Sequence, residues 1–126
     1  MKWFHKVRLE RLADKLTGEG AYAKVGPVPA HKFDMEYIFA KSRGGKSIKS
    51  KQFNPKKCNT AACALGWAAN DPWFLRKGTL DEFNPKFWGT TGSQYCELFM
   101  AGSYDDGRRV KAHVVAARLR KAARTS

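Results

Sequence analysis

The chain lacks an uncharged apolar run of membrane-spanning length. Its longest stretch without charges or strong helix breakers, from Thr60 to Asn70, is about half of the ~20 residues that a transmembrane helix requires. The positively charged N-terminus is followed by no apolar segment with a small-residue cleavage site, so we expect no leader peptide. These features predict a soluble chain without membrane contact, located in the cytoplasm.

Cysteines are few, and their number is odd. Without a leader peptide, this favours reduced thiols in an intracellular compartment over a disulfide framework. Cys58 and Cys63 are spaced like one half of a zinc site. Cys96, His31 and His113 are the remaining candidate ligands, but a second closely spaced pair is absent. We therefore predict no bound metal, and packing roles for the thiols.

No catalytic constellation stands out. Cys58 follows Lys56 and Lys57 near an expected helix start, where the pKa of a thiol is lowered, but no base lies near it in the sequence. Residues 40–47 fit a loose form of the phosphate-binding loop. That loop requires a helix directly after it, whereas residues 48–55 have no amphipathic period and end in a proline. We predict no enzyme and no cofactor, and keep a cysteine-dependent enzyme as an alternative.

Acidic residues are scarce as well. The chain has 24 Lys and Arg against 11 Asp and Glu, a formal net charge of +13, and two of its segments contain no acid. Clustered cations displace counterions from phosphates, so these segments are the candidate nucleic-acid-binding sites. The candidate residues are Lys41, Arg43, Lys46, Lys49, Lys51, Lys56 and Lys57 in the first segment, and Arg108, Arg109, Lys111, Arg118, Arg120 and Lys121 in the second.

What the chain does contain is enough apolar residues for a core, at 43% hydrophobic and 13% aromatic content. Apolar periodicity and capping signals predict helices near residues 4–17, 34–42, 61–70, 91–101 and 105–123. The third is rich in alanine and glycine, so we expect it at the buried centre. In the last, we expect Val110, Val114 and Ala117 to line the apolar stripe, with Val115 and Leu119 beside it.

The expected fold class is mainly α: a compact single-domain bundle of about five short helices around a small-residue central helix. An α+β fold with a minor strand near residues 35–40 is the alternative, because Tyr37-Ile38-Phe39 has strong β preference. Residues 42–57, rich in Gly, Ser and Lys, are expected to form a mobile basic loop.

The run Cys58-Asn59-Thr60-Ala61-Ala62-Cys63, followed by Gly66, resembles a motif of small uncharacterised proteins from bacteriophages and proteobacteria. In that group a leucine-rich helix and a Phe-Asp-Met segment precede a Cys-Gly-Thr-Ala-x-Cys-x-x-Gly helix, and a Leu-Phe helix and a basic tail follow. The matching parts here are residues 9–16, 33–35, 58–69 and 98–99, with Asn59 in place of the usual glycine. The resemblance implies a shared fold and a phage context, with action in the host cytoplasm or in the virion. It implies no catalytic residues.

Together these observations predict a small basic phage-type protein that binds DNA or RNA mainly through phosphates. The alternative is a protein-interaction factor or inhibitor whose basic face docks on an acidic host or virion protein.

Overall fold

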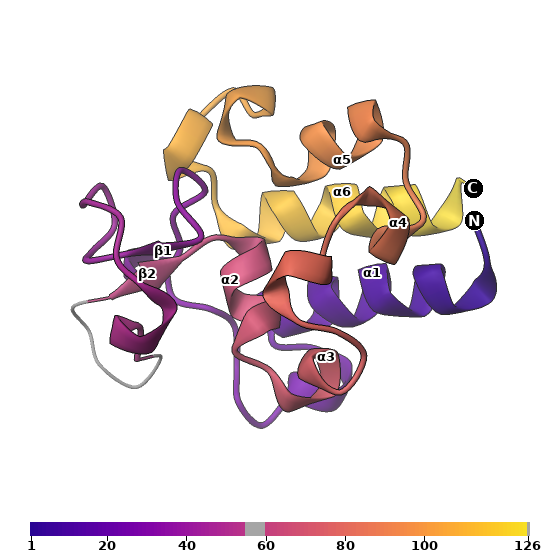
Figure 1. Ribbon diagram of the computed structural model, residues 1–126, viewed down its shortest axis with the longest axis horizontal. Helices are drawn as coiled ribbons and strands as arrows, with labels where there is room; N and C mark the ends of the chain where they lie inside the picture. The colour runs from indigo at the N-terminus through magenta and orange to yellow at the C-terminus, as the bar shows by residue number, and fades with distance from the viewer. Residues whose placement is uncertain (55–59, 126) are drawn as a thin grey trace.

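The computed structural model describes residues 1–54 and 60–125, and its architecture is mainly helical (Figure 1). Helical residues make up 57% of the chain and strands 5%, which confirms the expected fold class. None of the helices in the described residues has both the length and the apolarity that a bilayer crossing requires. The helices are α1 (Trp3–Thr17), α2 (Ala64–Ala69), α3 (Pro72–Leu75), α4 (Pro85–Trp88), α5 (Gly92–Phe99) and α6 (Ala112–Arg124), and the strands are β1 (Phe39–Ala40) and β2 (Ala61–Ala62).

The two longest helices, α1 and α6, lie side by side (Figure 1). Helix α1 has the expected bounds and buries Leu9, Leu12, Ala13 and Leu16 at helical spacing. Helix α6 begins at Ala112, later than expected, because residues 107–109 form a separate 3-10 helix, η6 (Gly107–Arg109), followed by an extended residue.

The later start of α6 changes which of its side chains form the apolar stripe. The buried residues of the helix are Ala112, Val115, Ala116, Leu119 and Ala123. Val114 is 37% exposed and Ala117 is also exposed, so the expected stripe was wrong at both positions. Val110 is buried, but it precedes the helix.

Helix α2 is the small-residue helix expected at the centre, and five of its six residues are buried. It is shorter than expected, because Ala61 and Ala62 form β2 and Cys63 is the N-cap. Small side chains are required here: a Cβ atom at Gly66 would lie 2.2 Å from the backbone oxygen of Ile38. The largest fully buried side chains of the core include Phe33, Phe74, Phe83 and Trp88, and the rings of Phe74 and Phe83 lie against Trp88.

The expected helix at residues 34–42 was wrong. The chain there is irregular up to β1, which pairs antiparallel with β2 in the register Phe39 to Ala62. It then reverses at residues 42–45 and returns beside β1, with the Ile48 N–H donating to the Phe39 oxygen and the Lys41 N–H to the Lys46 oxygen. We name residues 39–51 the basic hairpin; its last residues enter the 3-10 helix η3 (Ser50–Gln52). The strand of the α+β alternative thus exists, at the end of the range expected for it.

Candidate nucleic-acid interface

The basic hairpin is attached to the rest of the molecule through the carboxylate of Asp34, whose side chain is fully buried. Arg108 donates from Nε to both carboxylate oxygens at 3.2 Å and from Nη2 to Oδ2 at 2.8 Å. The backbone N–H groups of Glu36 and Gly44 also donate to this carboxylate, at 2.9 and 2.6 Å. Gly44 has a φ of +80°, a left-handed conformation that favours glycine and that presents its N–H to Asp34.

These contacts keep Asp34 ionised. Burial alone would raise the pKa of this carboxyl, but the hydrogen bonds from Arg108, Glu36 and Gly44 outweigh burial, so the pKa lies below its ordinary value. The same pair raises the pKa of Arg108, chiefly through the hydrogen bond to Asp34. The result is an ion pair under the turn of the hairpin, with a buried carboxylate and an Arg108 side chain that is 29% exposed.

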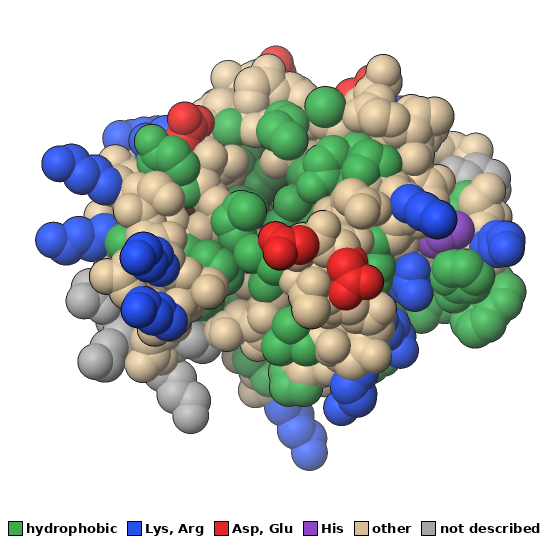
Figure 2. All heavy atoms as spheres, in the orientation of Figure 1, with side chains coloured by type: hydrophobic (Ala, Val, Ile, Leu, Met, Phe, Trp, Pro, Cys, Tyr) green, Lys and Arg blue, Asp and Glu red, His purple; other side chains and the backbone are tan. Residues whose placement is uncertain are grey.

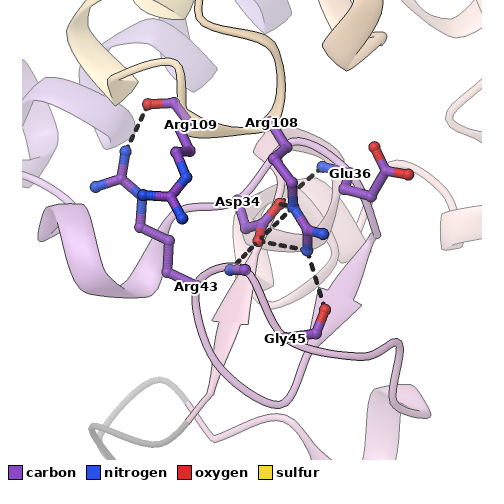
Figure 3. Close-up of polar contacts among 7 residues, drawn as sticks. Asp34, Glu36, Arg43, Gly45, Arg108 and Arg109 are labelled. Atoms are coloured by element: carbon purple, nitrogen blue, oxygen red, sulfur yellow. Dashed lines mark hydrogen bonds and ion pairs between the residues drawn. The ribbon is translucent and has the colours of Figure 1, made fainter.

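The ion pair joins the two acid-free segments (Figure 3). Arg108 Nη2 also donates to the backbone oxygen of Gly45 at 2.9 Å, and Arg43 Nη2 donates to the backbone oxygen of Arg109 at 2.5 Å. Hydrogen bonds therefore cross between the segments in both directions, over sequence separations of 63 and 66 residues. The turn of the basic hairpin therefore lies against Arg108 and Arg109, which lead into α6.

The lysine side chains of the basic hairpin are exposed to solvent. Lys41, Lys46, Lys49 and Lys51 are exposed, and none forms an ion pair with a carboxylate of the described residues. Arg109 and Lys111 are also exposed and unpaired with any described carboxylate. Figure 2 shows blue side chains gathered at the end of the molecule where Figure 1 places β1 and β2. We name the six exposed and unpaired residues the cationic surface: Lys41, Lys46, Lys49, Lys51, Arg109 and Lys111.

Two expected site residues of α6 have intramolecular partners instead. Arg120 Nη2 donates to the carboxylates of Asp14 at 3.0 Å and Glu19 at 3.2 Å. Asp14 lies on α1 and Glu19 follows the end of α1, so these contacts attach α6 to α1. Arg118 donates to the Glu97 backbone oxygen at 2.9 Å, and its guanidinium lies 3.9 Å from the centre of the Tyr104 ring. These arginines hold helices together, and with Arg108 they stand outside the cationic surface.

The remaining expected residues lie elsewhere. Lys121 is exposed near the far end of α6, away from the hairpin (Figure 1). Arg43 is half-buried and braces the hairpin against Arg109. Lys56 and Lys57 lie outside the described residues, as does Cys58.

An open groove of about 710 Å³ adjoins the cationic surface, and no pattern in the sequence indicates it. Its lining includes Tyr37, Ile38, Ile48, Lys49 and Lys51. Tyr37 is 38% exposed, and the Arg108 guanidinium lies 5.5 Å from the centre of its ring. An exposed aromatic side chain beside lysines could be found only once the reversal of the chain was known.

The described cysteines have different surroundings. Cys63 is buried, and burial raises the pKa of its thiol to about 11, so the thiol stays protonated at neutral pH. Cys96 is exposed. Among residues 1–54 and 60–125, no three His, Cys, Asp or Glu side chains come together in a group that could hold a metal ion.

Comparison with known proteins adds no relative. The chain matches no protein-family model, no curated protein and no solved structure.

Proposed function

We propose that this chain is a small basic protein that binds nucleic acid, DNA or RNA, mainly through phosphate contacts made by the cationic surface. The observation that supports this most strongly is that hydrogen bonds of Arg108 and Arg43 join two acid-free segments at the Asp34–Arg108 pair. Six of those cations are exposed and have no described carboxylate as a partner.

The physical reason is the behaviour of counterions around a nucleic acid. A protein that neutralises phosphates with Lys and Arg releases condensed cations, and this release supplies most of the affinity for non-specific sites. All residues of the cationic surface except Arg109 are lysines. A lysine acts as a point charge on a flexible stem, which suits phosphates at variable positions. Little sequence readout is expected from such contacts, because phosphates carry no sequence information.

The net charge of +13 supports the same proposal. Charge of one sign repels itself in the compact state, and a polyanion relieves that repulsion. The phage context of the proposal, with action in the host cytoplasm or in the virion, rests on the resemblance of the Cys-Asn-Thr-Ala-Ala-Cys motif alone.

The test is a binding titration of the purified full chain with a generic duplex and with a single strand, at about 50 and 200 mM salt. We expect binding at low salt and a loss of at least about tenfold in affinity at the higher salt, because several phosphates are neutralised. An affinity that stays constant between the two salt concentrations would contradict the proposal.

A second measurement separates nucleic acid from an acidic protein, since both would respond to salt. A nucleic-acid binder purified from cells carries nucleic acid that nuclease removes. A chain that keeps an acidic protein partner after nuclease treatment, and that binds no added nucleic acid, would overturn the proposal in favour of protein docking.

A further inference from the structure

The groove beside the hairpin combines features that a duplex does not need. Its lining includes an exposed aromatic ring, Tyr37, two aliphatic side chains, Ile38 and Ile48, and two lysines, Lys49 and Lys51. Phosphates of a duplex require only the cations, because the bases of a duplex are already stacked on one another. An aromatic side chain near lysines is the combination that binds unpaired bases.

The groove opens at the base of the basic hairpin, between residues 36–39 and 47–51, with Leu80 also in its lining. The Ile48 N–H still donates to the Phe39 oxygen, but in the described residues no backbone hydrogen bond joins 36–38 to 49–52. One side of the groove is formed by Tyr37 and Ile38, which follow Asp34 in the chain, and the Tyr37 ring lies near Arg108. The other side is formed by Lys49 and Lys51, at the start of η3. Its volume of about 710 Å³ falls within the roughly 300–1,000 Å³ range of small-ligand pockets.

Tyr37 is held in place although it is exposed. The Arg108 guanidinium lies 5.5 Å from the ring centre, and Arg108 itself is fixed by Asp34 and by the Gly45 oxygen. One residue further on, the Ile38 oxygen accepts the Cys63 N–H at 3.2 Å and lies against Gly66 of α2. The backbone next to Tyr37 is therefore anchored, and the ring has a fixed guanidinium beside it, so ordering the ring when a base stacks on it costs less conformational entropy.

Charge gives the groove a direction. Glu36 is the carboxylate among the lining residues, and it lies one residue from Tyr37, whereas Lys49 and Lys51 come from the opposite arm. Phosphates avoid the carboxylate and approach the lysines, so the bases face Tyr37.

We propose that this groove binds a single-stranded segment of nucleic acid, with an unpaired base stacked on Tyr37 and the adjoining phosphates on Lys49 and Lys51. This rests on the proposed function and makes its ligand specific: single strands are preferred over duplexes at equal length and salt.

The test uses the full chain and three fluorescent probes: a ten-residue oligothymidine, a strand of the same length with abasic sites, and a duplex. Tyr37→Leu keeps an apolar side chain but removes the ring, and we expect about tenfold weaker binding of the oligothymidine, the loss of roughly one stacked base. Binding of the abasic strand and of the duplex should change by less than about twofold, because they place no base on the ring. Tyr37→Phe should bind all three probes as the natural chain does.

Two further variants serve as controls. Trp3→Leu removes another exposed aromatic ring, 75% exposed and at the N-terminus, and should change no affinity. Glu36→Gln removes the carboxylate from the groove and should strengthen binding of the oligothymidine and the abasic strand about equally, by roughly twofold. Circular dichroism and thermal unfolding of each variant establish that the fold is intact.

The outcomes separate this proposal from the one before it. If all three probes bind and Tyr37→Leu weakens none of them, or weakens them equally, the groove proposal is wrong while phosphate binding stands. If no probe binds the natural chain at low salt, the proposed function itself fails. A chain that binds an acidic peptide and none of the three probes would contradict both.

Discussion

The lysines of the basic hairpin and two arginines of α6, Arg118 and Arg120, come from equally acid-free sequence, yet they differ in what their side chains contact. In α6, Arg118 and Arg120 reach a backbone oxygen, two carboxylates and an aromatic ring on neighbouring elements. In the hairpin, the lysines extend into solvent from a backbone fixed at Asp34. Charge counts alone therefore overestimate a binding surface: arginine beside a packed helix joins helices, whereas lysine on a short turn stays available to a ligand.

The largest expected effect on stability is the loss of the ion pair beneath the hairpin. Asp34→Ala removes the carboxylate that accepts hydrogen bonds from Arg108, Glu36 and Gly44. The guanidinium and the two backbone N–H groups then lose this acceptor. Because the carboxylate is buried but the Arg108 side chain is 29% exposed, we expect a cost of about 2.5 kcal/mol in the free energy of unfolding, less than for a fully buried pair. Urea denaturation followed by circular dichroism measures it, and a cost under about 1 kcal/mol would show that Asp34 does not hold the hairpin.

Acid should reproduce part of that loss. Because the folded protein holds the pKa of Asp34 below its ordinary value, its contribution to stability is complete above about pH 4 and is lost as the pH falls through the folded pKa. Asp34→Asn cannot titrate at this position. We expect its stability to decline less steeply than that of the natural chain below pH 4, measured by thermal unfolding across a pH series.

A second change separates the hairpin from α2 and leaves the contacts of α6 in place. Gly66→Ala would place a Cβ atom 2.2 Å from the Ile38 oxygen, so β1 must move away from α2. Overpacking of this kind costs about 2 kcal/mol. Hydrogen exchange should show faster exchange at the Cys63 and Ile48 N–H groups, with the N–H groups of α6 unchanged; a uniform increase would mean that the two regions are not independent.

A smaller effect is expected from the ion pairs that attach α6. Arg120→Gln removes the ion pairs with Asp14 and Glu19, whose side chains are 34% and 61% exposed. Exposed pairs of this kind contribute about 1 kcal/mol or less, and salt screens them. Denaturation at low and high salt measures the difference, and affinity for nucleic acid should stay within about twofold of the natural value.

The sequence predicted elements whose signals are local. The capping box of Thr91 and Gln94 is present, with the Thr91 hydroxyl accepting the Gln94 N–H at 3.1 Å and the Gln94 side chain accepting the Thr91 N–H at 2.9 Å. Helix α1 likewise follows from its leucine spacing and from Gly18, which adopts a φ of +70° at the C-cap.

The sequence could not predict elements that depend on distant partners. Asp34 has the side chain of a helix N-cap, but its carboxylate is taken by Arg108, 74 residues away, so no helix follows. The same reversal of the chain creates the groove at Tyr37, which no local pattern indicates. For the candidate site, composition located the lysines of the hairpin correctly on the surface, but it could not tell them from Arg118 and Arg120, whose partners come from other elements.

The most direct test of the cationic surface compares two variants with the same net charge. One replaces Lys41, Lys46, Lys49 and Lys51 by glutamine; the other replaces Lys2, Lys6, Lys86 and Lys121, which lie on α1, α4 and α6 or next to them. The measurement is the dependence of single-strand affinity on salt concentration. We predict that the magnitude of the log–log slope falls by about 3 in the hairpin variant, near 0.7 for each phosphate that is no longer neutralised, and that the control keeps the natural slope. Equal slopes for the two variants would contradict a localised surface and leave only the total charge of the chain.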